Sequence, residues 1–408
     1  MKLNSIFSMG LCAALFVAGA TFTSCSDDDS FAPNQEVFDF STVKTVKLNA
    51  QLGQQAKEDV IGVFETKDAA LKAAQREDLT VSNQKSDMIY SCFLNEEGAV
   101  NATINMPKRL NKMYVISLTN PALGVATVDV KSNVSLTAND FVKTPETANA
   151  PRKANSLITE DWHCIATYAY EDIWPTGGDF DLNDIIIEHW QQMTYTSKNY
   201  VRVVRDVFKL VSKKDAATYA DAFYVQVPAN QKKSEADFYS YVEDEGSFEE
   251  DELLTEEGNC YEEETQSIVV FNNQHNMFAK GIGGVMVVRA FSGIDVTKDD
   301  VCYNPYIISQ ADKNLGAGRY EVHIPGYAIT SLGKVLPNTP DNFYATQFVS
   351  EGGEYPFAVS LQGVSGWQAP DPAVRVCDTF THYDAWTKSK GAEYNDWYLN
   401  KAGYDVRK

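Results

Sequence analysis

A dense group of oxygen-bearing side chains stands between residues 171 and 184. Within it, Asp179, Asp181 and Asn183 are spaced two apart and directly follow a Gly-Gly pair. Oxygen ligands on a turn that can fold back on itself suit a hard divalent cation such as Ca²⁺. We therefore predict a structural calcium site whose candidate ligands are Glu171, Asp172, Asp179, Asp181, Asn183 and Asp184.

The loop differs from an EF-hand at two positions. Its D-x-D-x-N series fits the first, third and fifth positions of such a loop, but Asp184 stands where Gly is required. Trp190 occupies the twelfth position in place of a bidentate Glu. We expect a cation between two strands, with Glu171 or Asp172 completing the ligands. The alternative interpretation is that these side chains cap their own backbone amides as Asx-turns and bind no metal.

Other kinds of chemistry have weaker signals. Zinc prefers His or Cys; His163 and His189 flank the loop, but no H-E-x-x-H or paired C-x-x-C occurs, so we expect both to be buried by packing. No G-x-S-x-G motif is present, and no pair of carboxylates is marked out by its setting. We predict that the protein is not an enzyme. The alternative is a glycan-active enzyme with two carboxylates facing an open groove.

The strands that should hold the loop belong to the second of two β-rich units. Residues 36–136 alternate apolar and polar positions in about seven runs, which predicts an N-terminal β-sandwich with one short helix at 67–78. Residues 137–156 are polar and contain two prolines, which is typical of a linker. A larger sandwich or jelly-roll-like domain is predicted for residues 157–408.

Two segments of this second unit carry specific expectations. The runs CIATYAY and IIIEHW, on either side of the acidic loop, predict paired strands. Near the end, residues 370–389 change to a helical period, with Asp371 as the N-cap and Pro372 as the first helical residue. The apolar positions of this predicted C-terminal helix are Ala373, Val376, Cys377, Phe380, Tyr383 and Trp386.

The first residues have the pattern of an export signal. Lys2, a short apolar run and small residues up to Cys25 predict a lipoprotein signal peptide at 1–24, with Cys25 as the acylated residue that anchors the chain to the outer membrane. Residues 25–35 form an acidic tether. Its Ser-Asp-Asp-Asp stretch resembles the surface-export tag of Bacteroidetes lipoproteins, which implies exposure on the cell surface.

The net charge limits the binding partners of the chain, and the cysteine count limits its disulfides. A formal net charge of −21 argues against nucleic acid, and residues 243–264 hold twelve acidic side chains without Lys or Arg. We expect a solvated loop there, with a second cation site as the alternative. Beyond Cys12 and Cys25, an odd number of cysteines remains. We expect Cys92 and Cys164 to be buried, inert thiols.

The tryptophans leave two interpretations open. They could stack on sugar rings if they lined a groove, but most stand in segments that predict core packing. The residues concerned are Trp162, Trp174, Trp367, Trp386 and Trp397.

Five blocks, in order, resemble the LruC-type domain of secreted and lipid-anchored bacterial surface proteins. They are AYEDIWPTGGDFDLNDIIIEHW, CYNPYI at 302–307, EVHIPGY at 321–327, YPFAV at 355–359 and FTHYDAWTKSKGAEYNDWY at 380–398. The chain departs from the family at 355–367, where a more regular Pro-Trp block is common. This family has no established activity, so the resemblance implies a fold and a surface location. We expect a calcium-stabilised role in adhesion, glycan or host-matrix contact, or envelope structure. A pilus-like subunit that donates its N-terminal strand, VFDFSTVKTVKL, is a further alternative.

Overall fold

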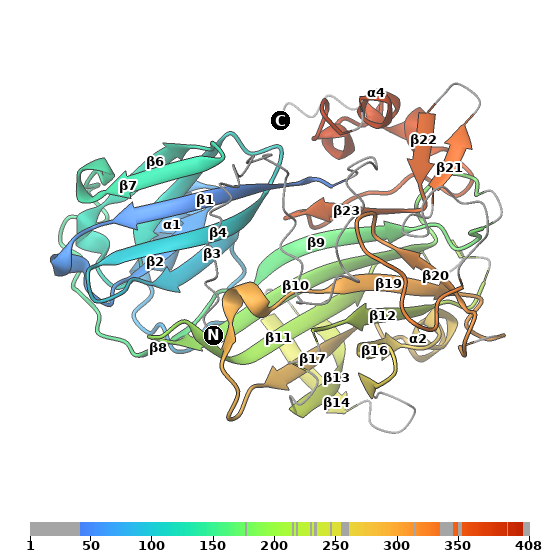
Figure 1. The fold of residues 1–408 in the computed structure, drawn as a ribbon, viewed down its shortest axis with the longest axis horizontal. Coiled ribbons are helices and arrows are strands. Elements are labelled where there is room, and N and C mark those ends of the chain that lie inside the picture. Colours follow the sequence, from blue (N-terminus) through green and yellow to red (C-terminus); the bar gives the residue numbers. More distant parts are fainter. Residues whose placement is uncertain are drawn as a thin grey trace, which may run out of the picture.

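The computed structural model describes residues 41–402, except for 176–177, 214–215, 218, 229–230, 232–234, 245–246, 254–260, 314, 335–345, 350–352 and 390. The signal peptide, Cys25 and the acidic tether lie outside the described residues. Within them, the fold is mainly β, as predicted, with several sheets and few helices (Figure 1). None of the described helices has the length and apolar character needed to cross a bilayer.

The first unit is a β-sandwich with one helix. Apolar residues alternate along its strands, so that one face of each sheet turns inward, and Leu48, Val63 and Val115 are fully buried between the sheets. One sheet contains β4 (Ala99–Pro107), β1 (Val43–Gln51) and β7 (Asn133–Thr137). The other contains β3 (Met88–Phe93), β2 (Val60–Phe64), β5 (Lys112–Ser117) and β6 (Val125–Asp129).

The predicted helix at 67–78 is α1, Lys67–Gln75, which ends three residues earlier than expected. The side chain of Thr66 accepts a hydrogen bond from the backbone N–H of Ala69 and so caps its first turn. After β7, the segment predicted as a linker lies along this sandwich. Arg152 pairs with Asp59 at 2.8 Å, and Lys153 donates to the Ala74 carbonyl.

The second unit is a larger sandwich of a nine-stranded and a five-stranded sheet. Residues from both sheets, such as Ile187, Phe223 and Ile307, form one buried core. The large sheet contains β14 (Ser247–Leu253), β13 (Glu235–Asp244), β17 (Gly284–Ala290), β11 (Tyr200–Leu210), β10 (Ile185–Thr196), β9 (His163–Tyr170) and β23 (Ala358–Gln362), with β18 (Val296–Thr297) and β8 (Leu157–Thr159) at its margins. The small sheet contains β15 (Tyr261–Glu262), β16 (Ser267–Phe271), β12 (Ala222–Gln226), β19 (Asn304–Ser309) and β20 (Tyr320–His323).

The remaining elements lie beside these sheets. Helix α2 (Gln274–Lys280) follows β16 and ends at Gly281, whose left-handed conformation (φ 70°) closes the helix. Strands β21 (Thr346–Val349) and β22 (Gly353–Pro356) pair with each other and lead into β23. In Figure 1 they stand next to the C-terminal helices.

The predicted C-terminal helix at 370–389 is shorter and interrupted. It consists of α3 (Val376–Thr379) and α4 (Tyr383–Lys388), and Arg375, not Asp371, precedes the first helical residue. Ala373 has a left-handed backbone (φ 61°) and is exposed. Between the two helices, Phe380 is extended and bridges to Lys401.

This interruption places Phe380 inside an aromatic cluster. Its ring stacks on Trp367 at 5.6 Å and meets the edge of Trp397 at 5.5 Å. Tyr383, Trp386 and Trp397 are fully buried in the same cluster, which covers the outer face of β9, β10 and β23. Four of the six predicted apolar positions are buried (Val376, Phe380, Tyr383 and Trp386), whereas Cys377 is half-buried and Ala373 is exposed, and the backbone is not one continuous helix.

The two units share a common core. Phe64 and Phe93 of the first sandwich join Tyr195, Val204 and Phe291 of the second in one buried cluster. Polar contacts reinforce this junction: Arg76 pairs with Asp161 at 2.9 Å, and Lys298, which pairs with Glu160 in the second unit, donates to the Ser91 carbonyl of the first unit at 2.7 Å. The units are thus held against each other by apolar packing, a buried ion pair and this hydrogen bond.

Candidate metal centre

The acidic loop joins β9 to β10, which pair antiparallel from Tyr170 and Ile185 onward. The predicted strands on either side are confirmed, and both are buried on the sheet. Within the loop, Phe180 and Leu182 have left-handed backbones, with φ of 64° and 53°. Such conformations cost about 1–3 kcal/mol each outside glycine and persist where surrounding contacts hold them.

Three of the six predicted ligands lie together. Oxygen atoms of Glu171, Asp179 and Asp181 are all within 4.8 Å of one another. This is the only such group of three acidic, His or Cys side chains among the described residues. Glu171 is 2% exposed and Asp179 is at the surface, so the group runs from the interior to the solvent.

One oxygen of Glu171 has no hydrogen-bond partner. Oε1 accepts from the backbone N–H of Leu182 at 2.5 Å, whereas the buried Oε2 accepts from no donor. A buried carboxylate oxygen without a donor is costly unless something else compensates its charge. A cation held by this group would provide that compensation.

Asp181 and Asn183 also support the loop as caps. Asp181 accepts from the backbone N–H of Asn183 at 3.1 Å and from that of Ala373 at 2.8 Å. Asn183 donates its side-chain amide to the Pro370 carbonyl at 3.3 Å, while its Oδ1 is buried without a partner. The Asx-turn interpretation therefore describes Asp181, and it leaves Glu171 Oε2 and Asn183 Oδ1 unexplained.

Asp172 and Asp184 lie in a different contact. Asp184 accepts from the backbone N–H of Asp172 at 2.8 Å, and Asp172 accepts from that of Tyr219 at 3.1 Å. Asp221, at the start of β12, also hydrogen-bonds the side chain of Asp172 and is fully buried. The structure thus separates these two predicted ligands from the Glu171 group and adds Asp221 to them.

The surroundings of Glu171, Asp184 and Asp221 disfavour the charged form of their carboxylates. Burial, together with the charges of Asp181 and Asp179, raises the pKa of Glu171 to about 8. Burial and the charge of Asp172 raise the pKa of Asp184 to about 10 and that of Asp221 to about 8. None of the ion pairs among the described residues involves these side chains. A bound cation would stabilise the ionised form of Glu171.

Sequence reasoning did not single out Asp221. It is one acidic residue before an ordinary apolar strand, and no motif surrounds it. Only the packing of the small sheet against the β9–β10 end brings it next to Asp172.

The two histidines beside the loop do not form a shared metal site. His163 contacts the Asp161 carbonyl through Nδ1 at 3.2 Å. His189 lies between the hydroxyl of Tyr168, at 3.1 Å, and Oδ1 of Asp206, at 2.9 Å. Both rings are buried, as expected, and each is held by partners of its own.

The tryptophans lie in the core of the protein. All five tryptophans considered as sugar platforms are at least nine-tenths buried, which fits the core interpretation.

The expectation of a solvated loop over residues 243–264 is wrong where the structure describes it, because β14 occupies Ser247–Leu253 and pairs with β13. In its sequence, SFEEDEL, four acidic residues stand in a row, so no alternation of apolar and polar positions indicated this strand.

The fold and the loop together define a mainly β protein of two sandwiches with a candidate metal centre between strands. Residues 202–398 match a family model described as a domain of unknown function (DUF4842). The LruC resemblance stays a prediction, because the matching model has another description. No curated protein matches the chain.

Two solved structures show different degrees of likeness. The fold is similar to that of a putative lipoprotein from Bacteroides ovatus, with a TM-score of 0.50 and 16% sequence identity over 84% of this chain and 98% of that chain. At this identity the likeness concerns the fold. BcpA, the major pilin subunit of Bacillus cereus, aligns over 79% of this chain and 96% of that chain with 9% identity and a TM-score of 0.14.

Proposed function

We propose that this protein is a non-enzymatic bacterial surface lipoprotein, anchored through Cys25 and stabilised by Ca²⁺, with a role in adhesion, glycan contact or envelope structure. The observation that carries the calcium part is the unpartnered, buried Oε2 of Glu171 beside Asp179 and Asp181. Three carboxylates without a basic partner among the described residues suit a hard cation.

Calcium fits this group better than magnesium or zinc. Ca²⁺ takes six to eight oxygen ligands in flexible geometry, so backbone carbonyls and waters could complete three side chains from a loop. Mg²⁺ requires a rigid octahedron and retains water, and Zn²⁺ favours His or Cys. We assign Glu171, Asp179 and Asp181 as the side-chain ligands and Asn183 as a further oxygen donor.

Burial of the candidate catalytic groups supports a non-enzymatic role. The described carboxylates with strongly raised pKa values, Glu171, Asp184 and Asp221, are all buried at the loop end of the sandwich. A glycosidase would need two carboxylates with separate environments beside an open groove. The sugar-stacking tryptophans that would accompany such a groove are in the core.

The pairing of β1 favours this proposal over a pilus-like subunit. Donor-strand exchange requires an N-terminal strand that leaves its own domain. Here β1 pairs with β4 along its whole length and with β7 on its other side. It is therefore the central strand of its own sheet.

The lipid anchor rests on the sequence and has a direct test. We expect metabolic labelling with a palmitate analogue to modify the wild-type chain, and Cys25→Ser to abolish both the label and membrane fractionation. Accessibility of intact cells to an antibody or protease would then test the surface location. A labelled Cys25→Ser variant would contradict the assignment of the anchor.

The calcium site is tested by melting and calorimetry. Calcium at about 100 times its Kd would add about 2.7 kcal/mol to the free energy of unfolding, which raises the melting temperature by several degrees. We expect EDTA to remove this increase, and Asp181→Ala to melt at one temperature with or without Ca²⁺. Asp78→Ala, on an exposed turn, is the matched control. An unchanged wild-type melting temperature in EDTA would exclude a stabilising calcium site.

A further inference from the structure

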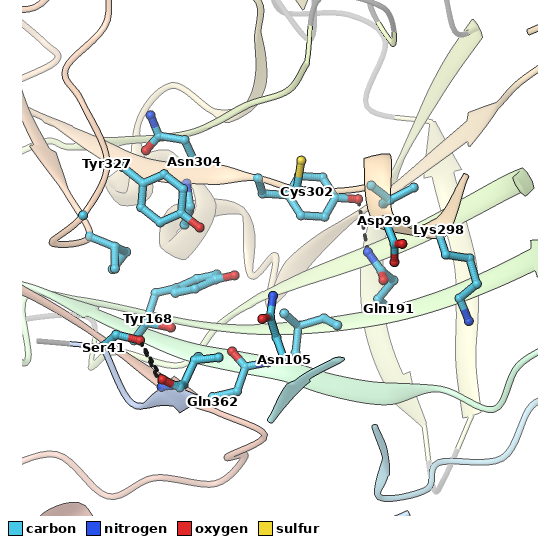
Figure 2. A pocket seen from close by; sticks show the side chains of 18 of the residues that line it. Ser41, Asn105, Tyr168, Gln191, Lys298, Asp299, Cys302, Asn304, Tyr327 and Gln362 are labelled. Atoms are coloured by element: carbon cyan, nitrogen blue, oxygen red, sulfur yellow. Dashed lines mark hydrogen bonds between the residues drawn. The ribbon is translucent and has the colours of Figure 1, made fainter. Parts of the chain in front are cut away.

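A pocket of about 300 Å³ lies at the junction of the two sandwiches, away from the acidic loop. Its walls come from β1, β3 and β4 on one side and from β9, β10 and residues 298–305 and 324–327 on the other. Figure 2 shows Tyr327 on one side of the pocket and Asn105 and Gln362 on the other. The volume is at the lower end of the range for small-molecule sites, roughly 300–1,000 Å³.

One end of the pocket is aromatic. Tyr168, Tyr303 and Tyr327 line it from β9, from the segment before β19 and from the turn after β20. Tyr168 and Tyr327 lie at the end opposite Lys298 and Asp299 in Figure 2. Aromatic faces combined with a few polar groups are typical of sites that bind ligands with apolar faces and polar edges.

A buried network holds these rings in place. The Tyr168 hydroxyl bonds Nδ1 of His189, and Nε2 of His189 bonds Asp206. Tyr303 donates to the same carboxylate at 2.6 Å, and Gln191 donates to both at 2.9 Å and 3.2 Å. Because the hydroxyls of Tyr168 and Tyr303 already have partners, the orientations of these two rings are fixed before any ligand binds, which lowers the entropy cost of binding.

Two side-chain amides that line the pocket from β4 and β23 have spare hydrogen-bonding capacity. The side chain of Asn105 accepts from Thr45 through Oδ1 at 3.2 Å, which leaves its NH₂ group for another partner. Gln362 uses its backbone N–H to bond Thr42, and this bond does not involve its side-chain amide. Carboxamides both donate and accept, so they match hydroxyl groups, which do the same.

The aromatic end carries no free charge. Lys298 is the only Lys or Arg among the described residues that line the pocket, and it pairs with Glu160. Its ammonium group also lies 4.9 Å and 4.5 Å from the ring centres of Tyr90 and Tyr195. Burial lowers the pKa of His163, which keeps this ring neutral. Phosphate, sulfate or carboxylate groups would therefore find no unpaired cation here.

From these contacts we infer that the pocket binds the uncharged end of a saccharide, one or two sugar units long, with a ring against the half-buried Tyr303 and Tyr327 and hydroxyls on Asn105 and Gln362. This inference deepens the glycan-contact role proposed above and rests on it. Calcium is not required by the pocket itself, because none of the lining residues belongs to the Glu171 group.

The test uses the full-length lipoprotein in detergent micelles on an array of neutral, sialylated, sulfated and uronic-acid glycans. We expect binding to neutral glycans, followed by calorimetry with the strongest of them. Asn105→Ala and Gln362→Ala should each weaken binding by about tenfold, the effect of one lost hydrogen bond at the upper end of its usual range. Asn101→Ala is the matched control, because it is on the same strand and does not line the pocket.

The outcomes separate this inference from the calcium site. Binding restricted to acidic glycans, no binding at all, or equal affinity in Asn105→Ala, Gln362→Ala and wild type would overturn it. If EDTA lowers the melting temperature while no neutral glycan binds, only the saccharide inference fails. If neutral glycans bind while EDTA has no effect on melting, only the calcium site fails.

Discussion

The free oxygen of Glu171 points at the backbone of Gly178. A Cβ atom at position 178 would lie 2.4 Å from Glu171 Oε2 and 3.3 Å from Cδ of the same carboxylate. Because Oε1 is held by the N–H of Leu182, the carboxylate cannot turn away without losing that bond. Glycine at this position therefore lets the loop close over the acid and keeps Oε2 available to a cation.

Gly178→Ala should displace the Glu171 carboxylate and weaken Ca²⁺ binding by about tenfold or more, as calorimetry would measure. The reason is steric, since the new methyl group occupies the position of Oε2. Gly333→Ala is the matched control, because its Cβ would lie 2.6 Å from Glu321 Oε2, far from the loop in sequence. This variant should lose stability but keep its calcium affinity. Equal calcium affinities in Gly178→Ala and wild type would contradict the assigned ligand.

Part of this site was predictable from the sequence. The D-x-D-x-N series and the flanking apolar runs located the loop and its two strands, because short-range patterns determine both. The distinction between Glu171 and Asp172 was not predictable. Neighbouring residues at the end of a strand point to opposite sides, so one joins Asp181 and the other joins Asp221.

The pocket at the junction of the two sandwiches was beyond the reach of sequence patterns. It brings Asn105 of β4 next to Gln362 of β23, residues separated by more than half of the chain. No period or motif records the docking of two sandwiches, which depends on apolar packing such as that of Phe93 against Tyr195. The predicted C-terminal helix is longer than the observed helices for a similar reason. The packing of Phe380 against Trp367 and Trp397 outweighs the helical spacing of the apolar residues around it.

Glu321 should make stability depend on acid pH. Hydrogen bonds and charges from His323 and Arg319, at 3.0 Å and 2.7 Å, outweigh burial and lower its pKa to about 2. A lowered pKa means that its contribution is complete above the unfolded value of 4.5 and is lost as pH falls toward 2. The loss is roughly 3 kcal/mol.

Urea unfolding of wild type and Glu321→Gln between pH 7 and pH 2 would measure this contribution. The difference in free energy of unfolding between the two proteins should shrink steadily below pH 4.5. Using the difference cancels the opposite trend from acids with raised pKa values, such as Asp184. A difference that stays constant down to pH 2 would show that Glu321 is not ionised in the folded protein.

The cysteines should differ in reactivity. Cys92 is buried as predicted, whereas Cys164 is half-buried, as is Cys377 near Arg375. Burial raises the pKa of Cys92 to about 12 and that of Cys164 well above its usual range. Since the thiolate is the reactive form, iodoacetamide at pH 8 should label Cys377 first. Peptide mapping by mass spectrometry follows each site, and denaturant should equalise the rates. Rapid labelling of Cys92 in the folded protein would contradict its burial.

The ion pair between Lys298 and Glu160 should be the most sensitive polar contact at the junction. Both side chains are largely buried, at 7% and 1% exposure, and Glu160 also accepts from Ser91. Removing one partner of a buried pair leaves an uncompensated charge and typically costs about 3–5 kcal/mol. Lys298→Ala should therefore unfold at much lower denaturant concentration than wild type.

Adding Glu160→Gln to that variant should recover most of the lost stability, because the remaining side chain is then neutral and still accepts the hydrogen bond of Ser91. Lys213→Ala is the control, since its pair with Asp371 is exposed, at 59% and 82%. Solvent screens such a pair, so its loss should leave the unfolding midpoint unchanged. If Lys298→Ala behaved like Lys213→Ala, the Lys298–Glu160 pair would not contribute to the stability of the protein. Rescue by Glu160→Gln would instead show that the charge left on Glu160 causes the instability.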